Sequence, residues 1–181
     1  MRRIRLIIAY DGTNYVGWQV QPNGVSIQAH LERALFELTG ETVRVEGSGR
    51  TDSGVHARAQ VAHFDTEARM AADKFAVAMN MHLPADIRVL YSEECDPAFH
   101  ARFSAKHKQY AYTVQIGAHA DVFSRFTTLH LHNIPDFDAM QQAASMLLGT
   151  HDFSAFKCAG RDVDSAVRTI YQSEWTKNSA F

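Results

Sequence analysis

"GSGRTDSGVHARAQVAHFDT", from Gly47 to Thr66, joins two kinds of sequence. Its first half sets glycines around Arg50 and Asp52, and glycine permits a positive φ and the close approach of another group. Its second half alternates apolar and polar residues, as does the segment 42–47 before it, so a strand is predicted on each side. We therefore expect a loop that carries a cation and a carboxylate between two strands.

The segments around this loop predict a complete β-α-β-β-α-β unit. The predicted strands lie at 5–11, 42–47, 59–65 and 86–94, and the predicted helices at 26–40 and 71–83. Ser26 is the candidate N-cap of the first helix, and Gly40 is its stop signal. This order is the split βαβ, or ferredoxin-like, arrangement.

The rest of the chain predicts a shorter β-α-β series. A strand is expected at 107–117, a helix at 137–149 and a strand at 166–177, with a loop at 149–162. This series reads as an incomplete copy of the first unit. We therefore predict an α+β protein of two ferredoxin-like halves with mainly antiparallel sheets, at 1–103 and 104–181, the second half incomplete.

Composition favours a globular cytoplasmic protein. The 181 residues are 46% hydrophobic and 21% charged, with a formal net charge of −2. No apolar run reaches the roughly 20 residues of a membrane span, and the N-terminal apolar run is too short for a signal peptide. Cys95 and Cys158 lie far apart without a CxxC spacing, which predicts reduced thiols.

The carboxylate in the glycine-rich loop has two interpretations. Asp52 lies two residues from Arg50, and that cation could hold it ionised, ready to act as a nucleophile or general base. The alternative is an ordinary Asx-type turn with a surface Arg–Asp pair. The spacing leaves both open. The sequence lacks the GK[ST] ending of a phosphate-binding loop.

A basic and aromatic stripe runs from Ala98 to Tyr112. It contains Arg102, Lys106 and Lys108 and no Asp or Glu, with Tyr110 and Tyr112 interleaved. Rings among phosphate-seeking cations suit single-stranded nucleic acid. A solvated, partly aromatic strand explains the pattern about as well.

Other aromatic and histidine residues favour structural interpretations. Tyr15 and Trp18, in the loop at 9–21, could grip a base, but filling the core is the favoured interpretation. Phe153 and Phe156 are predicted as core anchors, and Arg168 could face a phosphate. The ten histidines form no HExxH or Cys/His cluster, so no metal site is predicted.

Taken together, several blocks resemble the TruA family of tRNA pseudouridine synthases. They are YDGTNYVGWQVQ, SIQAHLERAL, GSGRTDSGVHARAQVAHFDT, LPADIRV, FHARFSAKHKQYAYTV and GTHDFSAF, in the family's order from Arg3 to about Ile170. The resemblance implies the pseudouridine synthase fold. It also implies a reaction that needs no metal and no cofactor. In that reaction the uridine N1–C1′ bond breaks, the base turns over, and C5 joins C1′.

The resemblance also implies residue roles. Asp52 matches the catalytic aspartate, which either adds to uracil C6 or assists through the sugar. Arg50 matches an arginine implicated in base flipping, which any enzyme acting on a stacked base requires. Tyr110 would stack on the uracil, with Tyr112 packed beneath it. Apart from the resemblance, the basic residues Lys108, Arg102 and Arg168 are the expected RNA contacts.

The substrate implied is the tRNA anticodon arm, at positions 38 to 40, and the family acts as a cytoplasmic homodimer. The family's last block, like RANAFLxxMVRN, is missing from these 181 residues. We therefore expect a truncated chain with weak or absent catalysis. An RNA-binding remnant that no longer isomerises uridine is the alternative.

Overall fold

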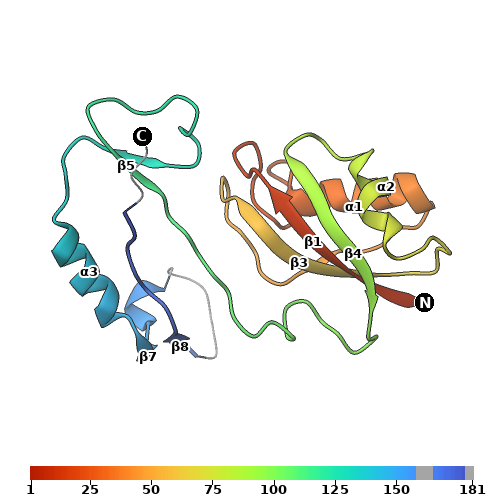
Figure 1. Cartoon of the computed structure of the whole chain (residues 1–181). Helices are drawn as coiled ribbons and strands as arrows, with labels where there is room; N and C mark the ends of the chain where they lie inside the picture. Colours follow the sequence, from red (N-terminus) through yellow and green to blue (C-terminus); the bar gives the residue numbers. More distant parts are fainter. Residues whose placement is uncertain (158–164, 178–181) are drawn as a thin grey trace. The chain divides into compact units, whose positions relative to one another are not determined.

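The protein folds as two compact units, Met1–Tyr112 and Thr113–Phe181, as the computed structural model in Figure 1 shows. The structure describes residues 1–157 and 165–177. The predicted boundary after residue 103 falls inside the first of these units. As a boundary between two related halves, it stays a prediction.

The first unit is a four-stranded antiparallel sheet with two helices on one face (Figure 1). Its strands are β1 (Arg2–Tyr10), β2 (Glu46–Gly47), β3 (Ala57–Thr66) and β4 (Ile87–Cys95), in the spatial order β2-β3-β1-β4. Its helices are α1 (Ile27–Thr39) and α2 (Lys74–Asn80). The predicted β-α-β-β-α-β order is confirmed here, and the spatial order is that of the split βαβ arrangement.

The core of the first unit lies between the sheet and its helices. Every second residue of β1 is buried, as a strand with one covered face requires: Ile4, Leu6, Ile8 and Tyr10. The helices contribute apolar side chains at helical spacing, namely Ile27, Leu31, Leu35, Phe75 and Met79. Burial of this apolar surface is the main stabilising term for the unit.

Helix α1 begins and ends where its sequence predicts. The Ser26 hydroxyl accepts a hydrogen bond from the Ala29 N–H at 3.2 Å, as an N-cap does. Gly40 adopts φ +74°, and its N–H donates to the Phe36 carbonyl at 2.8 Å. Glycine reaches this left-handed conformation without steric cost, so the helix stops there.

The strand before the loop is shorter than predicted, because helix side chains take its backbone groups. The Val45 N–H donates to Glu32 Oε1 at 3.1 Å, and its carbonyl accepts from Gln28 Nε2 at 3.2 Å. Both partners belong to α1. Residues 42–45 therefore lie outside the sheet, and only Glu46 and Gly47 pair with β3.

The sheet face away from the core carries ionic cross-strand pairs. Arg3 and Asp65 are register partners on β1 and β3, and the guanidinium donates twice to the carboxylate, each time at 2.7 Å. On the other side of β1, Arg5 forms an ion pair with Glu93 of β4. Arg3 also donates to the carbonyls of Pro97 and Phe99, at 2.8 and 2.7 Å, which holds the chain after β4 against this face.

The second unit contains small separate elements. Its strands β5 (Val114–Ile116) and β6 (Leu129–Leu131) pair in parallel, whereas β7 (Gly149–Asp152) and β8 (Val167–Ile170) pair antiparallel. Along the chain, helix α3 (Phe137–Met146) follows β6 and precedes β7. A short 3₁₀ turn, Ser154–Phe156, follows β7. The described residues thus form two two-stranded sheets in place of one β-α-β sheet.

Several predictions for the second unit are wrong in extent or burial. The strand expected at 107–117 covers three residues, and the expected loop at 149–162 begins with β7. Phe156 is not a core anchor, since it is 78% exposed; its ring lies 5.9 Å from that of half-buried Phe153. Ala144 is the one hydrophobic residue buried in the described part of this unit. With so few buried neighbours, local elements stay short.

The described residues also bear on the composition-based expectations. Cys95 is a free thiol, whereas Cys158 lies outside the described residues. Burial raises the pKa of the Cys95 thiol, which disfavours the reactive thiolate. Among the described helices, none is long and apolar enough to cross a membrane.

The Arg3–Asp65 pair predicts a pH-dependent stability. Hydrogen bonding and charge from Arg3 lower the pKa of Asp65 below its ordinary value. Its stabilisation is therefore present above about pH 4 and is lost as the pH falls through the lowered pKa. We expect Asp65→Asn to reduce the free energy of unfolding by about 1 kcal/mol at neutral pH and by much less near pH 3.

Urea unfolding at the two pH values measures this difference. Asp73→Asn is the matched control, because Asp73 pairs with Lys74 at 3.1 Å while both side chains are about two-thirds exposed. The control should change stability only slightly at either pH. An Asp65→Asn deficit that persists undiminished at about pH 3 would contradict the assignment to the ion pair.

Candidate active-site loop

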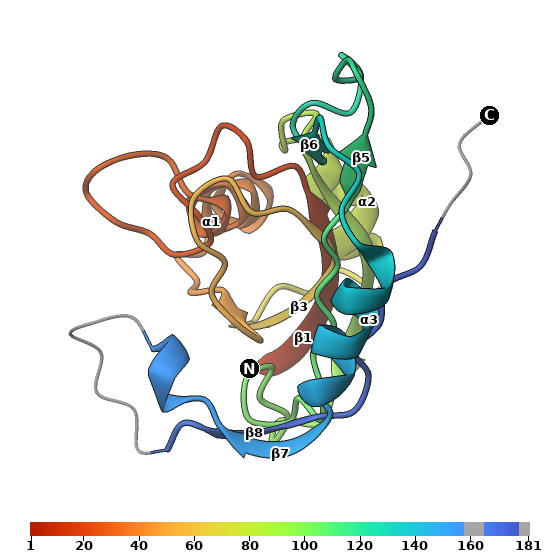
Figure 2. The same cartoon turned by 90° about the vertical axis from the view of Figure 1, so that its left-hand side faces the viewer.

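The loop 48–56 between β2 and β3 is held by the loop between β1 and α1, drawn in red to orange in Figure 2. The Trp18 N–H donates to the Thr51 carbonyl at 3.0 Å. The Tyr15 carbonyl accepts from the Gly54 N–H at 3.3 Å and from the Ser53 hydroxyl at 3.1 Å. Two segments far apart in sequence thereby form one rigid structure at an end of the sheet.

The aromatic residues of the first of these loops belong to the core. Tyr15 and Trp18 are both buried, so the core interpretation of these rings is confirmed. The Tyr15 hydroxyl donates to Asp86 Oδ1 at 2.6 Å, and burial together with that carboxylate raises the tyrosine pKa. The loop is thus anchored to the residue just before β4 as well as to the core.

Glycines make room for close contacts inside the protein. A Cβ on Gly47 would lie 2.7 Å from atoms of the Trp18 ring, and a Cβ on Gly49 would lie 2.7 Å from Lys108 Nζ. Gly17 has φ +105°, and a Cβ there would lie 2.4 Å from the Thr51 carbonyl oxygen. At these positions it is the chain's own groups that approach the glycine.

Arg50 and Asp52 are both exposed, and they flank the half-buried Thr51. In the described part of the chain no ion pair joins Arg50 to Asp52, so neither the stabilising contact nor the surface pair considered from the sequence is formed. An exposed pair gains little in water, which explains its absence. The turn that follows is closed by the backbone, with the Val55 N–H donating to the Asp52 carbonyl at 3.2 Å and Gly54 at φ +78°.

The far end of the loop is fixed by His56. Its Nδ1 lies 3.0 Å from Asp11 Oδ1 and 3.2 Å from the Gly12 nitrogen; it donates to Asp11 when protonated and accepts from the Gly12 N–H when not. Asp11 also accepts from the N–H and the hydroxyl of Thr13, and these hydrogen bonds lower its pKa. The loop therefore meets the end of β1 just before β3 begins.

Lys108 is the predicted RNA contact that lies beside this loop, with its ammonium group against Gly49. Tyr110 is 77% exposed, so its ring is accessible. Tyr112 is 86% exposed and does not pack beneath anything, contrary to the expectation. Both tyrosines precede β5 and have no strand partner, because pairing begins only at Val114.

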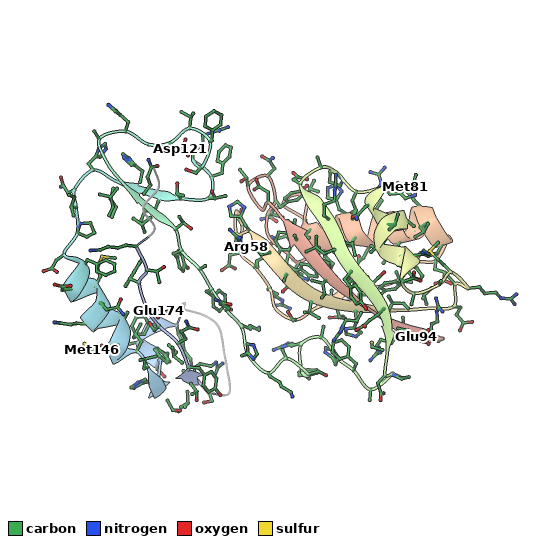
Figure 3. All side chains as sticks on the ribbon, viewed as in Figure 1. Arg58, Met81, Glu94, Asp121, Met146 and Glu174 are labelled. Atoms are coloured by element: carbon green, nitrogen blue, oxygen red, sulfur yellow. The ribbon has the colours of Figure 1, made fainter. Side chains whose placement is uncertain are left out.

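Figure 3 shows the two ends of the sheet. Arg58, at the start of β3, marks the end that carries the loop 48–56, and Glu94 marks the opposite end.

Arg102 and Arg168 lie elsewhere. Arg102, whose guanidinium is 5.6 Å from the Phe103 ring centre, lines a cavity of about 750 Å³ together with Arg3, His63 and Asp65. These neighbours belong to the half of β1 and β3 remote from the loop. Arg168 lies on β8 in the second unit, where it donates to the carbonyls of Ser165 and Val167.

The described residues contain no group of three His, Cys, Asp or Glu side chains that could hold a metal ion. The histidines that do meet have other neighbours. The rings of His130 and His132 are 4.6 Å apart in the second unit. Buried His63 accepts from the Ala101 N–H at 3.3 Å, and burial lowers its pKa.

The fold and the loop together define an α+β protein with an exposed carboxylate on a tightly held glycine-rich loop, and the comparisons agree on its family. A family model described as tRNA pseudouridine synthase matches residues 6–104 and 143–180. The chain belongs to this family.

Named relatives support the same membership. The chain is 50% identical over 171 residues to tRNA pseudouridine synthase A of Halalkalibacterium halodurans, covering 94% of this chain and 65% of that protein. It is 48% identical over 170 residues to tRNA pseudouridine synthase A of Acetivibrio thermocellus, covering 94% of this chain and 70% of that protein. The chain thus spans about two thirds of the length of these relatives.

Sequence reasoning placed Tyr15 and Trp18 in the core but did not find the other residues that hold the loop. Tyr10, Thr51 and His56 were not singled out, because each makes its contact with a residue some 40 positions away. No local signal set Thr51 apart from its polar neighbours Arg50 and Asp52.

The contact at Gly17 predicts an unusually damaging substitution. Gly17→Ala would combine a strained φ with a clash against the Thr51 carbonyl, so we expect a loss of about 2 kcal/mol or more in the free energy of unfolding. Gly40→Ala is the matched control. Its φ of +74° is also left-handed, but no atom lies within 4 Å of the added Cβ.

The control isolates backbone strain, which costs about 1 kcal/mol. Urea unfolding of both variants measures the difference. Equal losses would show that the packing of Gly17 against Thr51 is not tight.

Proposed function

We propose that this chain is a tRNA pseudouridine synthase unit in which Asp52 is the catalytic carboxylate. The observation that carries the proposal is the placement of Asp52. The residue is exposed, while its neighbour Thr51 and the following turn are hydrogen-bonded to the core-anchored loop. A carboxylate with free access to solvent on a fixed backbone suits attack on a nucleotide that enters from outside.

The reaction is an isomerisation that balances without any co-reactant. The N1–C1′ bond of uridine breaks, C5 bonds to C1′, the proton on C5 leaves to solvent, and N1 gains a proton. The role of Asp52 is to act as the nucleophile toward the base or the sugar. The uridine must leave its stack to reach a loop at the sheet end.

Arg50 and Lys108 are the proposed RNA contacts at this site. Arg50 is exposed next to Thr51, and the Lys108 ammonium group lies against Gly49. Arg50 on the loop and Lys108 beside it would provide phosphate contacts near a flipped nucleotide. Tyr110, exposed two residues after Lys108, provides a ring on which the uracil can stack.

Further parts of the proposal rest on the resemblance of the sequence blocks to the TruA family. These are the anticodon arm of tRNA as substrate and a homodimer. The sequence patterns themselves are the basis for proposing RNA contacts at Arg102 and Arg168, a second ferredoxin-like half and a location in the cytoplasm. The names of the relatives, which specify tRNA, support the choice of tRNA as substrate.

The proposal predicts that Asp52→Asn abolishes turnover. Tritium release from tRNA that carries [5-³H]uridine is the measurement, because joining C5 to C1′ expels that hydrogen whereas binding does not. We expect release to fall at least about 100-fold in Asp52→Asn, since the amide cannot act as nucleophile or base. Asp73→Asn, an exposed carboxylate at the start of α2, should release tritium at the parent rate.

Two outcomes would contradict this assignment. Release by Asp52→Asn at the parent rate would remove Asp52 from the reaction. Absence of release from the parent, with tRNA still bound, would show that these 181 residues bind RNA without isomerising uridine.

Binding itself predicts a salt dependence. Lys108→Ala should reduce the slope of log K against log salt concentration by about 1, because one phosphate contact and its released counterion are lost. Lys74→Ala is the matched control, because it removes an exposed lysine charge that is already paired with Asp73. It should leave the slope unchanged. Filter binding or fluorescence anisotropy across a salt series measures both. An unchanged slope in Lys108→Ala would place the RNA away from Gly49.

A further inference from the structure

Directly before Asp52, Thr51 makes one side-chain hydrogen bond and one backbone hydrogen bond, and two residues earlier the Gly49 carbonyl accepts from Gln60 Nε2. The Thr51 hydroxyl lies 2.9 Å from the Tyr10 hydroxyl. The Thr51 carbonyl accepts from the Trp18 N–H at 3.0 Å. With its side chain and its carbonyl both engaged toward the protein, Thr51 leaves Arg50 and Asp52 turned to solvent.

Tyr10 is a rigid partner for this contact. It is the last residue of β1, it is buried, and its ring centre lies 6.1 Å from that of Trp18. Burial raises its pKa, so the hydroxyl keeps its proton at neutral pH and can donate to Thr51 Oγ1. A two-torsion aromatic side chain at the end of a central strand has little freedom to follow a displaced loop.

The surrounding packing leaves little room for adjustment. Trp18 lies against Gly47 on one side of the loop, and Gly17 lies against the Thr51 carbonyl. Movement of Thr51 would therefore require movement of both chain segments. Loss of the one side-chain bond that ties Thr51 to the sheet removes the contact that sets the direction of the next residue, Asp52.

We propose that Tyr10 and Thr51 are a positioning pair for Asp52: their hydroxyl–hydroxyl hydrogen bond transmits the rigidity of β1 to the carboxylate. This inference rests on the proposed role of Asp52. Neither residue touches the reacting atoms. The pair acts on the maximum rate, because reactive groups must be held within fractions of an ångström of the productive geometry.

Amide hydrogen exchange tests the pair directly, with or without turnover. The reporters are the Trp18 N–H, which donates to Thr51, and the Gly54 N–H, which donates to Tyr15. In Tyr10→Phe and in Thr51→Val we expect both amides to exchange at least about tenfold faster, because the loop opens more often. Thr51→Ser keeps the hydroxyl and should retain the slow exchange of the parent.

Kinetics test the consequence for Asp52. We expect tritium release by Tyr10→Phe and Thr51→Val to show a kcat about 10- to 100-fold lower with KM within about twofold, and Thr51→Ser to recover most of the rate. The double variant should be no slower than either single variant, because both remove the same bond.

Matched controls remove hydroxyls elsewhere on the sheet. Tyr91→Phe removes a hydroxyl that donates to Glu93 at 3.1 Å, and Thr66→Val removes one that donates to Glu41 at 2.5 Å. Both should leave kcat and the two reporter amides unchanged.

The outcomes separate this inference from the proposed function. Unchanged exchange of both reporter amides in Tyr10→Phe overturns the positioning pair, whatever the activity. Faster exchange with an unchanged kcat overturns it as well. If the parent chain releases no tritium, the proposed function fails, and the exchange measurement alone decides whether the pair fixes the loop.

Discussion

The contact between two loops at one end of the first unit's sheet is the constraint on which the site depends. The Trp18 backbone and ring meet Thr51 and Gly47, and the core holds Trp18 in place. A buried tryptophan contributes a large apolar surface, so its position is strongly fixed. The loop that carries Arg50 and Asp52 takes its shape from this contact, because its own residues are exposed or only half-buried and form few bonds among themselves.

The two units differ in how much apolar surface they bury. In the first unit the sheet and two helices enclose a continuous apolar core. On the sheet face away from the core, the Arg3–Asp65 and Arg5–Glu93 ion pairs link neighbouring strands. The described part of the second unit buries very little, with Ala144 as its one fully covered hydrophobic residue. The residues proposed for catalysis lie on the first, better-packed unit, as a site that needs fixed geometry requires.

Glycine serves internal packing in this loop. From sequence, the glycines of GSGRTDSG indicate room for the close approach of another group. In the structure Gly47 leaves room for the Trp18 ring, which fixes the start of the loop. Gly49 leaves room for the Lys108 ammonium group, which brings a cation to the loop. In the proposed function, the exposed side chains of Arg50, Asp52 and Tyr110 are the groups that would meet RNA.

The sequence by itself determined the element order of the first unit, the caps of α1 and the family. These follow from local rules: apolar periodicity, Ser26 and Gly40 at the helix ends, and motif blocks that read directly from the chain. The short β2 and the exposure of Tyr112 and Phe156 were not predictable in this way. β2 is short because α1 side chains bond the Val45 backbone, Tyr112 lacks a strand partner, and Phe156 lies in a unit with little buried surface.

Only the tertiary structure decided what holds Asp52. Tyr10 and Thr51 are far apart in sequence, and nothing local to either residue indicates the other. Their contact exists because β1 and the loop before β3 end at the same end of the sheet. There the buried Trp18 contacts both, through its ring against Tyr10 and its N–H to the Thr51 carbonyl. Local sequence supplied the carboxylate, and long-range packing supplied its position.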